Sequence, residues 1–156
     1  MRIELLALGT RMPDWVEAGV AEYVRRLGPE VRFELREIPL ARRAGDSNPA
    51  RAVADEGARM LKSIRTDAFV VALDVRGKVF STEQLGEWLN GRMTESRDLT
   101  FLIGGPDGLA PDCLSRSDLR WSLSALTLPH ALVRVIIVEQ LYRALSLLKG
   151  HPYHRA

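Results

Sequence analysis

Short apolar runs typical of buried strands alternate with amphipathic segments of helical spacing along the whole chain, and this alternation restricts the fold more than any single motif does. The run at residues 68–74 is continuously apolar up to Asp74, which is typical of an interior strand of a parallel sheet. Residues 31–38 instead alternate apolar and charged side chains, which predicts a strand with one wet face at a sheet edge. Strands separated by helices predict an α/β layer fold with a largely parallel sheet.

The complete prediction has five strands that are mostly separated by helices. The predicted strands cover residues 2–8, 31–38, 68–74, 99–103 and 119–124. The predicted helices cover residues 13–27, 50–64, 82–93, 111–116 and 129–149. The helix at 82–93 begins with the capping-box pair Ser81 and Gln84. Because 156 residues is about the length of one domain and neither a repeat nor a linker interrupts the pattern, we expect a single domain over residues 1–156.

Composition excludes several classes of protein. The chain is 46% hydrophobic and 27% charged, which is typical of a folded globular protein and not of a disordered one. The longest apolar stretch, residues 133–138, is interrupted by Arg134, whereas a membrane-spanning helix needs about 20 apolar residues. The amino terminus has Glu4 and lacks the apolar core of a signal peptide, so a cytosolic location is expected. One cysteine and three histidines without ligand spacing predict no metal site.

The charge balance permits a nucleic-acid partner without requiring one. The formal net charge is only +2. Residues 41–49 are rich in Arg, Gly, Asp, Ser and Asn and predict a mobile loop that carries Arg42 and Arg43. Two interpretations of this loop stay open, namely contact with RNA phosphates and an ordinary solvated surface loop.

Three segments follow predicted strands and are therefore candidates for a ligand site. They are residues 74–78, 104–109 and 124–129. Ligands of open α/β sheets bind at the carboxyl ends of the strands, where loops expose backbone donors and acceptors. Gly104 and Gly105 would permit close approach of backbone to a ligand, although the same pair also fits a simple tight turn. Neither G-x-G-x-x-G nor the phosphate-binding G-x-x-x-x-G-K-[ST] pattern occurs in these segments, so di- and triphosphate binding has little support.

The segment at residues 125–128 is unusual because it is a loop of apolar side chains, Ala-Leu-Thr-Leu. Loops are normally polar, since a buried loop has to satisfy its own backbone hydrogen bonds. An apolar loop with free backbone groups could hold a flat aromatic ring such as adenine. Hydrogen bonds from the main chain of the loop would then hold the ring.

The last predicted helix, residues 129–149, is apolar on more than one face. Such a helix is buried on several sides, and in a small chain this predicts packing against the sheet and against a second subunit, most often through twofold symmetry. His130 and Arg134 share one side of the helix, while Glu139 and Arg143 lie on the opposite side. The Glu139–Arg143 pair is first of all ordinary i,i+4 helix support.

The chain ends with residues 150–156, which contain His151, Tyr153, His154 and Arg155. A frayed terminus is the default interpretation. Tyrosine and histidine also offer stacking surfaces and arginine offers a phosphate or base-edge donor, which is the mixture that grips unstacked RNA bases.

Taken together, several motifs closely resemble one family. They are Gly-Gly-Pro-Asp-Gly-Leu at 104–109, Trp-Ser-Leu-Ser-Ala-Leu-Thr-Leu-Pro-His at 121–130, Glu-Gln-Leu-Tyr-Arg-Ala at 139–144, Pro-Tyr-His-Arg at 152–155, Leu-Gly-Thr at 8–10 and Met-Pro-Asp-Trp at 12–15. Over its full length the chain resembles the RlmH family, the SPOUT-class methyltransferases of ribosomal large-subunit pseudouridine.

The resemblance implies an α/β-knot fold with a carboxy-terminal trefoil knot, an exception to the usual unknotted topology. It also implies a homodimer, S-adenosyl-L-methionine as the methyl donor, and N3 of a pseudouridine in 23S rRNA as the acceptor. Carried over by motif, the cofactor-binding residues would be Leu73, Gly104, Leu123, Ser124, Ala125, Leu126, Thr127 and Leu128. The family further suggests that the tail of one subunit completes the site of the other.

Methyl transfer to N3 needs a group that handles the N3 proton. We take His154 as the candidate base and His130 as the second candidate, because a general base typically contributes about 10²–10⁴-fold to the rate. Tyr153 would stack on the base, while Arg155 and Arg143 would hold phosphate or the developing uracil anion. Two rival classes stay open: a non-enzymatic ribosome-binding assembly factor, and an enzyme that acts on free nucleotides.

Overall fold

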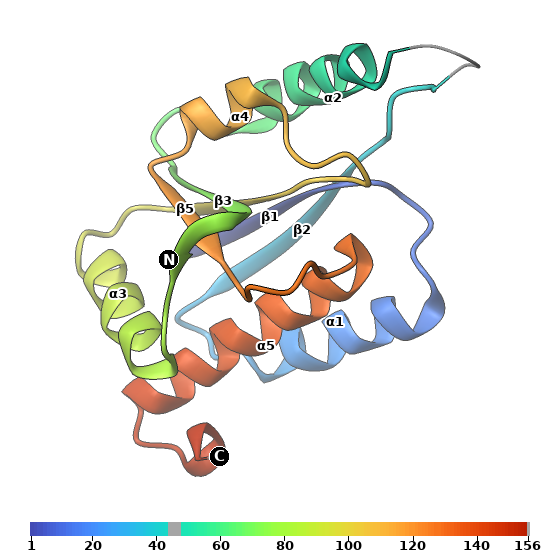
Figure 1. Ribbon diagram of the computed structural model, residues 1–156. Helices are drawn as coiled ribbons and strands as arrows, with labels where there is room; N and C mark the ends of the chain where they lie inside the picture. Colours follow the sequence, from blue (N-terminus) through green and yellow to red (C-terminus); the bar gives the residue numbers. More distant parts are fainter. Residues whose placement is uncertain (44–47, 156) are drawn as a thin grey trace.

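A five-stranded parallel sheet forms the centre of the protein, as the computed structural model shows for residues 1–43 and 48–155 (Figure 1). The strands are β1 (Arg2–Leu8), β2 (Arg32–Ile38), β3 (Phe69–Val79), β4 (Leu99–Ile103) and β5 (Leu119–Ser122). They lie in the order β2-β1-β4-β3-β5, and every neighbouring pair runs parallel. This architecture confirms the predicted α/β class. The trefoil knot stays a prediction of the resemblance.

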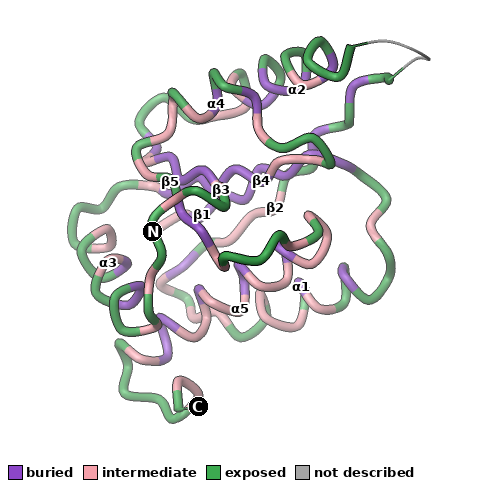
Figure 2. The backbone as a smooth tube through the Cα atoms, in the orientation of Figure 1, coloured by how far each residue is buried: buried purple, intermediate pink, exposed green. Residues whose placement is uncertain are grey.

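Helices cover both faces of the sheet, as Figure 1 shows. The helices are α1 (Asp14–Arg26), α2 (Pro49–Ser63), α3 (Thr82–Thr94), α4 (Pro111–Arg116) and α5 (His130–Leu148), followed by the 3₁₀ helix η1 (Pro152–His154). α1, α3 and α5 lie on one face, where Leu85 and Leu89 of α3 join the larger core cluster. α2 and α4 cover the other face through Met60 and Cys113. Figure 2 shows β1 and β4 as continuously buried strands, whereas most of β2 is intermediate or exposed.

The sequence pattern placed two strands correctly in the sheet. β2 is an edge strand, and Arg32, Arg36 and Glu37 in it are exposed. β3 lies inside the sheet between β4 and β5. Its residues Val70, Val71 and Ala72 are fully buried. The capping box at the start of α3 is present, because the Ser81 and Gln84 side chains each accept a hydrogen bond from the other's backbone N–H.

The predicted loop at residues 74–78 is part of β3 in the structure. β3 pairs with β5 on both sides of a register break between Leu73 and Lys78, so the strand bulges at this point and then continues to Val79. A Cβ atom on Gly77 would lie 2.6 Å from the backbone carbon of Arg120, so glycine allows the two strands to meet again after the bulge. The bulge displays Asp74 and Val75 at the carboxyl edge of the sheet.

The apolar faces of α5 are largely covered by the same chain. Ile137 and Leu141 are fully buried in the core against the sheet. Val135 faces Gly19 of α1, and Leu147 faces Gly86 of α3. Intramolecular packing therefore accounts for three of the apolar faces of α5, and the expected packing against a second subunit stays a prediction. Ile137 cannot lie at a subunit interface because it is 0% exposed.

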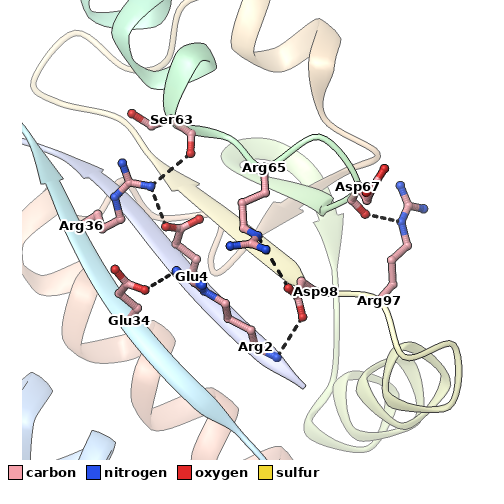
Figure 3. Close-up of polar contacts among 9 residues, drawn as sticks. All are labelled: Arg2, Glu4, Glu34, Arg36, Ser63, Arg65, Asp67, Arg97 and Asp98. Atoms are coloured by element: carbon pink, nitrogen blue, oxygen red, sulfur yellow. Dashed lines mark hydrogen bonds and ion pairs between the residues drawn. The ribbon is translucent and has the colours of Figure 1, made fainter.

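A network of ion pairs and hydrogen bonds closes the amino ends of the strands (Figure 3). Arg36 Nη1 donates to Glu4 Oε1 over 2.9 Å, and the Glu4 side chain is almost fully buried. The backbone N–H of Arg2 donates to Asp98 Oδ1 over 3.1 Å. The other members of the network are Glu34, Ser63, Arg65, Asp67 and Arg97. These arginines are held by acids and carbonyls, so the network ties the starts of β1, β2 and β4 to the segment before β3.

Candidate functional site

A cavity of about 380 Å³ lies at the carboxyl ends of β3, β4 and β5. The three segments chosen from the sequence meet in its wall, with α5 behind them. Of the expected cofactor residues, those that line the cavity are Leu73, Gly104, Leu123, Ser124, Leu126, Thr127 and Leu128. Ala125 is exposed and is absent from this lining. The cavity has the size of a small-molecule site, which usually measures about 300–1,000 Å³.

The loop after β4 forms one wall through its backbone. Gly108 has a φ of +80°, and its N–H donates to the Gly105 carbonyl over 3.0 Å, which closes the loop on itself. A Cβ atom on Gly104 would lie 2.6 Å from the backbone carbon of Gly108. Glycine at position 104 is therefore required by the loop's own backbone.

The outer side of this loop is tied to α2 through Arg43. The Arg43 guanidinium contacts Asp107 Oδ2 over 2.8 Å and Glu56 Oε1 over 2.6 Å. Glu56 is 0% exposed and also accepts a hydrogen bond from the Ala41 N–H. Arg43 is thus committed to intramolecular contacts, which weakens the RNA-contact interpretation for this residue. Residues 44–47 of the predicted loop lie outside the described residues.

The apolar segment after β5 forms the second wall. The Ser122 hydroxyl donates to the Ser124 carbonyl, and the Ser124 hydroxyl accepts from the Leu126 N–H, each over 3.0 Å. These local bonds shape the turn without help from regular secondary structure. Leu126 is 73% exposed although it lines the cavity.

The charge of the cavity is unusual. Among the lining residues that the structure describes, Asp74 is the only acid, and neither lysine nor arginine is present. His130 also lines the cavity, and burial, together with the positive charge of Arg134, lowers the pKa of its imidazole. The histidine is therefore predominantly neutral at physiological pH. The wall is apolar with one carboxylate, which disfavours phosphate-bearing ligands.

The remaining candidate residues gather around the end of the chain. Tyr153 donates from its hydroxyl to Glu139 Oε1 over 3.1 Å, and its ring centroid lies 4.6 Å from that of Tyr142. Arg143 forms an ion pair of 2.6 Å with the same Glu139 oxygen and lies over the Tyr153 ring. Burial, helped by the negative charge of Glu139, raises the pKa of Tyr153. The phenol therefore stays protonated and serves as a donor.

The tail is thus better packed than a frayed terminus. The His151 N–H donates to the Ser146 carbonyl, and the His154 ring contacts the His151 carbonyl. Arg155 is exposed. Sequence reasoning missed Tyr23, Tyr142 and Arg26, which complete the aromatic cluster around Tyr153. Their spacing along α1 and α5 could have revealed only that they face a neighbouring helix.

The cavity and the tail cluster are separate within one chain. His130 stands at the start of α5, whereas the tail packs beside Glu139 and Tyr142. About two and a half helical turns, or about 14 Å along the axis, separate His130 from Glu139. Among the described residues, no hydrogen bond or ion pair joins residues 151–155 to the cavity wall.

Neither a metal-binding cluster nor a membrane-spanning helix occurs in residues 1–43 and 48–155. That part of the chain contains no cluster of three or more His, Cys, Asp or Glu side chains arranged to hold a metal ion. Nor does any helix in it combine the length and the apolar character needed to cross a bilayer.

Comparison with known proteins identifies relatives over the whole chain. Residues 1–154 match the family model described as "Predicted SPOUT methyltransferase". The chain is 58% identical to the "Ribosomal RNA large subunit methyltransferase H" of Alkalilimnicola ehrlichii, with 100% of both chains covered. It is 55% identical to the protein of the same name from Thioalkalivibrio sulfidiphilus, with 99% of each covered.

Solved structures show the same fold at low sequence identity. A putative methylase family protein from Neisseria gonorrhoeae aligns with a TM-score of 0.54 and 13% identity, covering 90% of this chain and 81% of that one. A probable methylase family protein from Haemophilus influenzae aligns with a TM-score of 0.55 and 12% identity, covering 99% and 70%. At these identities the likeness concerns the fold alone.

Proposed function

Because this chain belongs to the SPOUT methyltransferase family, we propose that it transfers a methyl group from S-adenosylmethionine to ribosomal RNA of the large subunit. The full-length relatives named as ribosomal RNA large subunit methyltransferases support the RNA substrate. N3 of a pseudouridine in 23S rRNA, which the family resemblance implies, is the proposed acceptor. The single observation that supports S-adenosylmethionine as the cofactor is the cavity at the carboxyl edge of the sheet.

The residues of this cavity fit the cofactor. Its apolar walls suit adenine, and the wall after β4 presents backbone where glycines leave no side chain. The absence of lysine and arginine from the described lining suits a ligand without phosphate. Leu73, Gly104 and the segment at 123–128 would hold it. When bound, S-adenosylmethionine supplies a methyl group already activated on a sulfonium, so the protein has mainly to orient the reactants and exclude water.

The tail supplies the groups that the RNA base needs. Tyr153 offers a ring for stacking, Arg155 offers a cation, and His154 is the proposed acceptor of the N3 proton. His130 is the second candidate, because it lines the cavity and its lowered pKa leaves the imidazole free to accept a proton. Since a chain's own tail packs away from its cavity, we propose that the tail of a second subunit completes each site in a homodimer.

The proposed dimer predicts a specific effect of charge on α5. Leu132 and Ile136 are only half-buried and form an outward stripe on this helix. The double substitution Leu132→Asp and Ile136→Asp is expected to give folded monomers, measured by light scattering and circular dichroism. Leu148→Asp is the control, because this exposed leucine lies on another side of the helix. A folded double variant that stays dimeric would place the interface elsewhere.

The function is tested by tritiated methyl transfer from S-adenosylmethionine to ribosomes that lack the modification. We expect label in 23S rRNA and an N3-methylated pseudouridine by mass spectrometry of the nucleosides. Cofactor binding without transfer to any ribosomal particle would contradict the enzyme assignment, and ribosome binding without cofactor binding would favour an assembly factor. Methylation of free nucleotides at a rate comparable to that of ribosomes would favour an enzyme that acts on free nucleotides.

A further inference from the structure

Asp74 is the one charged group in the wall of the cofactor cavity among the residues that the structure describes. Its side chain is only 9% exposed. Oδ1 accepts a hydrogen bond from the Arg76 N–H over 3.1 Å, whereas Oδ2 is buried and has no hydrogen-bond partner. A buried carboxylate oxygen without a partner is costly, so a structure that retains one at a ligand cavity calls for an explanation.

The protein does not neutralise this carboxylate well. Arg76 lies 3.6 Å from Oδ1, but its side chain is 78% exposed, and ion pairs with so exposed a partner contribute little. The other ionisable group in the lining, His130, has a pKa lowered by burial and by Arg134, so it brings no compensating positive charge at neutral pH. The cavity is therefore an apolar space with one negative group.

The fold holds Asp74 in this place by the bulge of β3. The register break between Leu73 and Lys78 turns the strand at Asp74, and the pairing with β5 resumes beyond it. Leu73 and Val75 flank Asp74 in the same wall. The last torsion of an aspartate is soft, so a small rotation of the carboxylate can turn an oxygen toward a ligand in the cavity.

We propose that Asp74 recognises the positive charge of the methyl donor and thereby distinguishes the sulfonium cofactor from its neutral thioether product. This inference rests on the proposed function. S-adenosylmethionine and S-adenosylhomocysteine share adenosine and the amino-acid moiety and differ at the sulfur, which is methylated and positive only in the former. A carboxylate in an apolar, poorly hydrated wall attracts that cation more strongly than the same pair would in water. Asp74 is therefore a specificity-determining residue, and its charge favours release of the product after transfer.

The test compares both ligands on two variants of the full chain by isothermal titration calorimetry. Asp74→Asn keeps the shape of the side chain and removes its charge. We expect it to weaken S-adenosylmethionine binding by about tenfold or more, as is typical for losing an interaction with a charged group, and to change S-adenosylhomocysteine binding much less. Asp107→Asn is the matched control, because Asp107 lies on the same edge but binds Arg43 and does not line the cavity. It should leave the ratio of the two affinities unchanged.

Equal weakening of both ligands by Asp74→Asn, or no change in either, would overturn the proposal. A second measurement needs no variant. In the amine analogue sinefungin a protonated amine replaces the methylated sulfonium, and wild-type protein should bind it more tightly than S-adenosylhomocysteine. Tighter binding of the neutral ligand would also contradict a role for Asp74 in charge recognition. Wild-type protein that binds none of the three ligands would instead refute the proposed function itself.

Discussion

Gly104→Val is expected to weaken S-adenosylmethionine binding strongly while the sheet remains folded. A Cβ atom at this position would lie 2.6 Å from the backbone carbon of Gly108 and 2.8 Å from the backbone nitrogen of Leu109. Backbone cannot move aside as a flexible side chain does, so the loop has to open and the cavity loses its wall. Overpacking of this kind typically costs about 1–3 kcal/mol. If the free energy of the cofactor-bound state rises by that amount, the affinity for S-adenosylmethionine falls about fivefold to more than a hundredfold.

The measurement is calorimetry of cofactor binding, with thermal unfolding to show that the protein is folded. Gly91→Val in α3 is the matched control, since a Cβ atom there meets nothing within 4 Å. The control should bind the cofactor as the wild type does. Wild-type affinity in a folded Gly104→Val protein would show that the loop after β4 does not form the cofactor site.

The sequence pattern was sufficient to predict most of the strands and helices, because the periodicity of apolar side chains that marks buried positions can be read from a short segment. The predicted bounds of the strand at 99–103 and the helix at 111–116 agree with β4 and α4. β3 was predicted too short, because Asp-Val-Arg-Gly-Lys looks like a turn when read alone. Its continuation depends on the close approach of Arg120 to Gly77, a contact between residues distant in sequence.

Long-range partners of charged residues could not be predicted in the same way. Arg134 was expected only to share a side of the last helix with His130. In the structure it is 1% exposed, donates to the Gly9 carbonyl over 2.7 Å and forms an ion pair with Glu37. Arginine is rarely buried so completely, so composition and spacing give no signal for it. The Arg43–Asp107 contact and the place of Tyr153 beside Glu139 likewise arise only from the tertiary fold.

The cofactor segments were easier to find than the groups proposed for catalysis. Parallel strands bring their carboxyl ends to one edge, so Leu73, Gly104 and Leu123 had to lie near one another once the strands were recognised. No comparable rule places a tail that follows the last helix. Its position against α5 follows from Tyr153, whose ring and hydroxyl both find partners there.

Deletion of residues 153–156 is expected to abolish methyl transfer without abolishing cofactor binding. The cavity residues all precede the tail, so the truncated protein should still bind S-adenosylmethionine. Loss of the Tyr153 ring from its cluster with Tyr142 should cost about 0.5–1.5 kcal/mol of folding stability, more than a frayed end would and too little to unfold the core. Loss of the proposed base alone should slow transfer by about 10²–10⁴-fold. Calorimetry and tritium transfer to ribosomes measure the two effects separately.

His154→Ala in the full-length chain separates chemistry from packing, because Tyr153 stays in place in that variant. Transfer should fall nearly as far as in the deletion, whereas the melting temperature should stay close to that of the wild type. Normal transfer by His154→Ala would exclude this side chain as the base and leave His130, which lines the cavity, as the remaining candidate.

Mixing two defective subunits tests whether the tail works across the dimer. A tail-deleted subunit has an intact cavity, and a full-length Gly104→Val subunit has an intact tail. If each tail serves the partner's cavity, one of the two sites in the heterodimer combines both intact parts, and activity should return to about half that of the wild-type dimer. The subunits carry different affinity tags, so that purification through both tags yields only heterodimers. If instead each tail serves its own chain, the tail-deleted subunit has a cavity without a tail and the other has a tail without a cavity, and the purified heterodimer stays inactive. Because the tail of a single chain packs beside Glu139, about 14 Å along α5 from His130, we expect recovery.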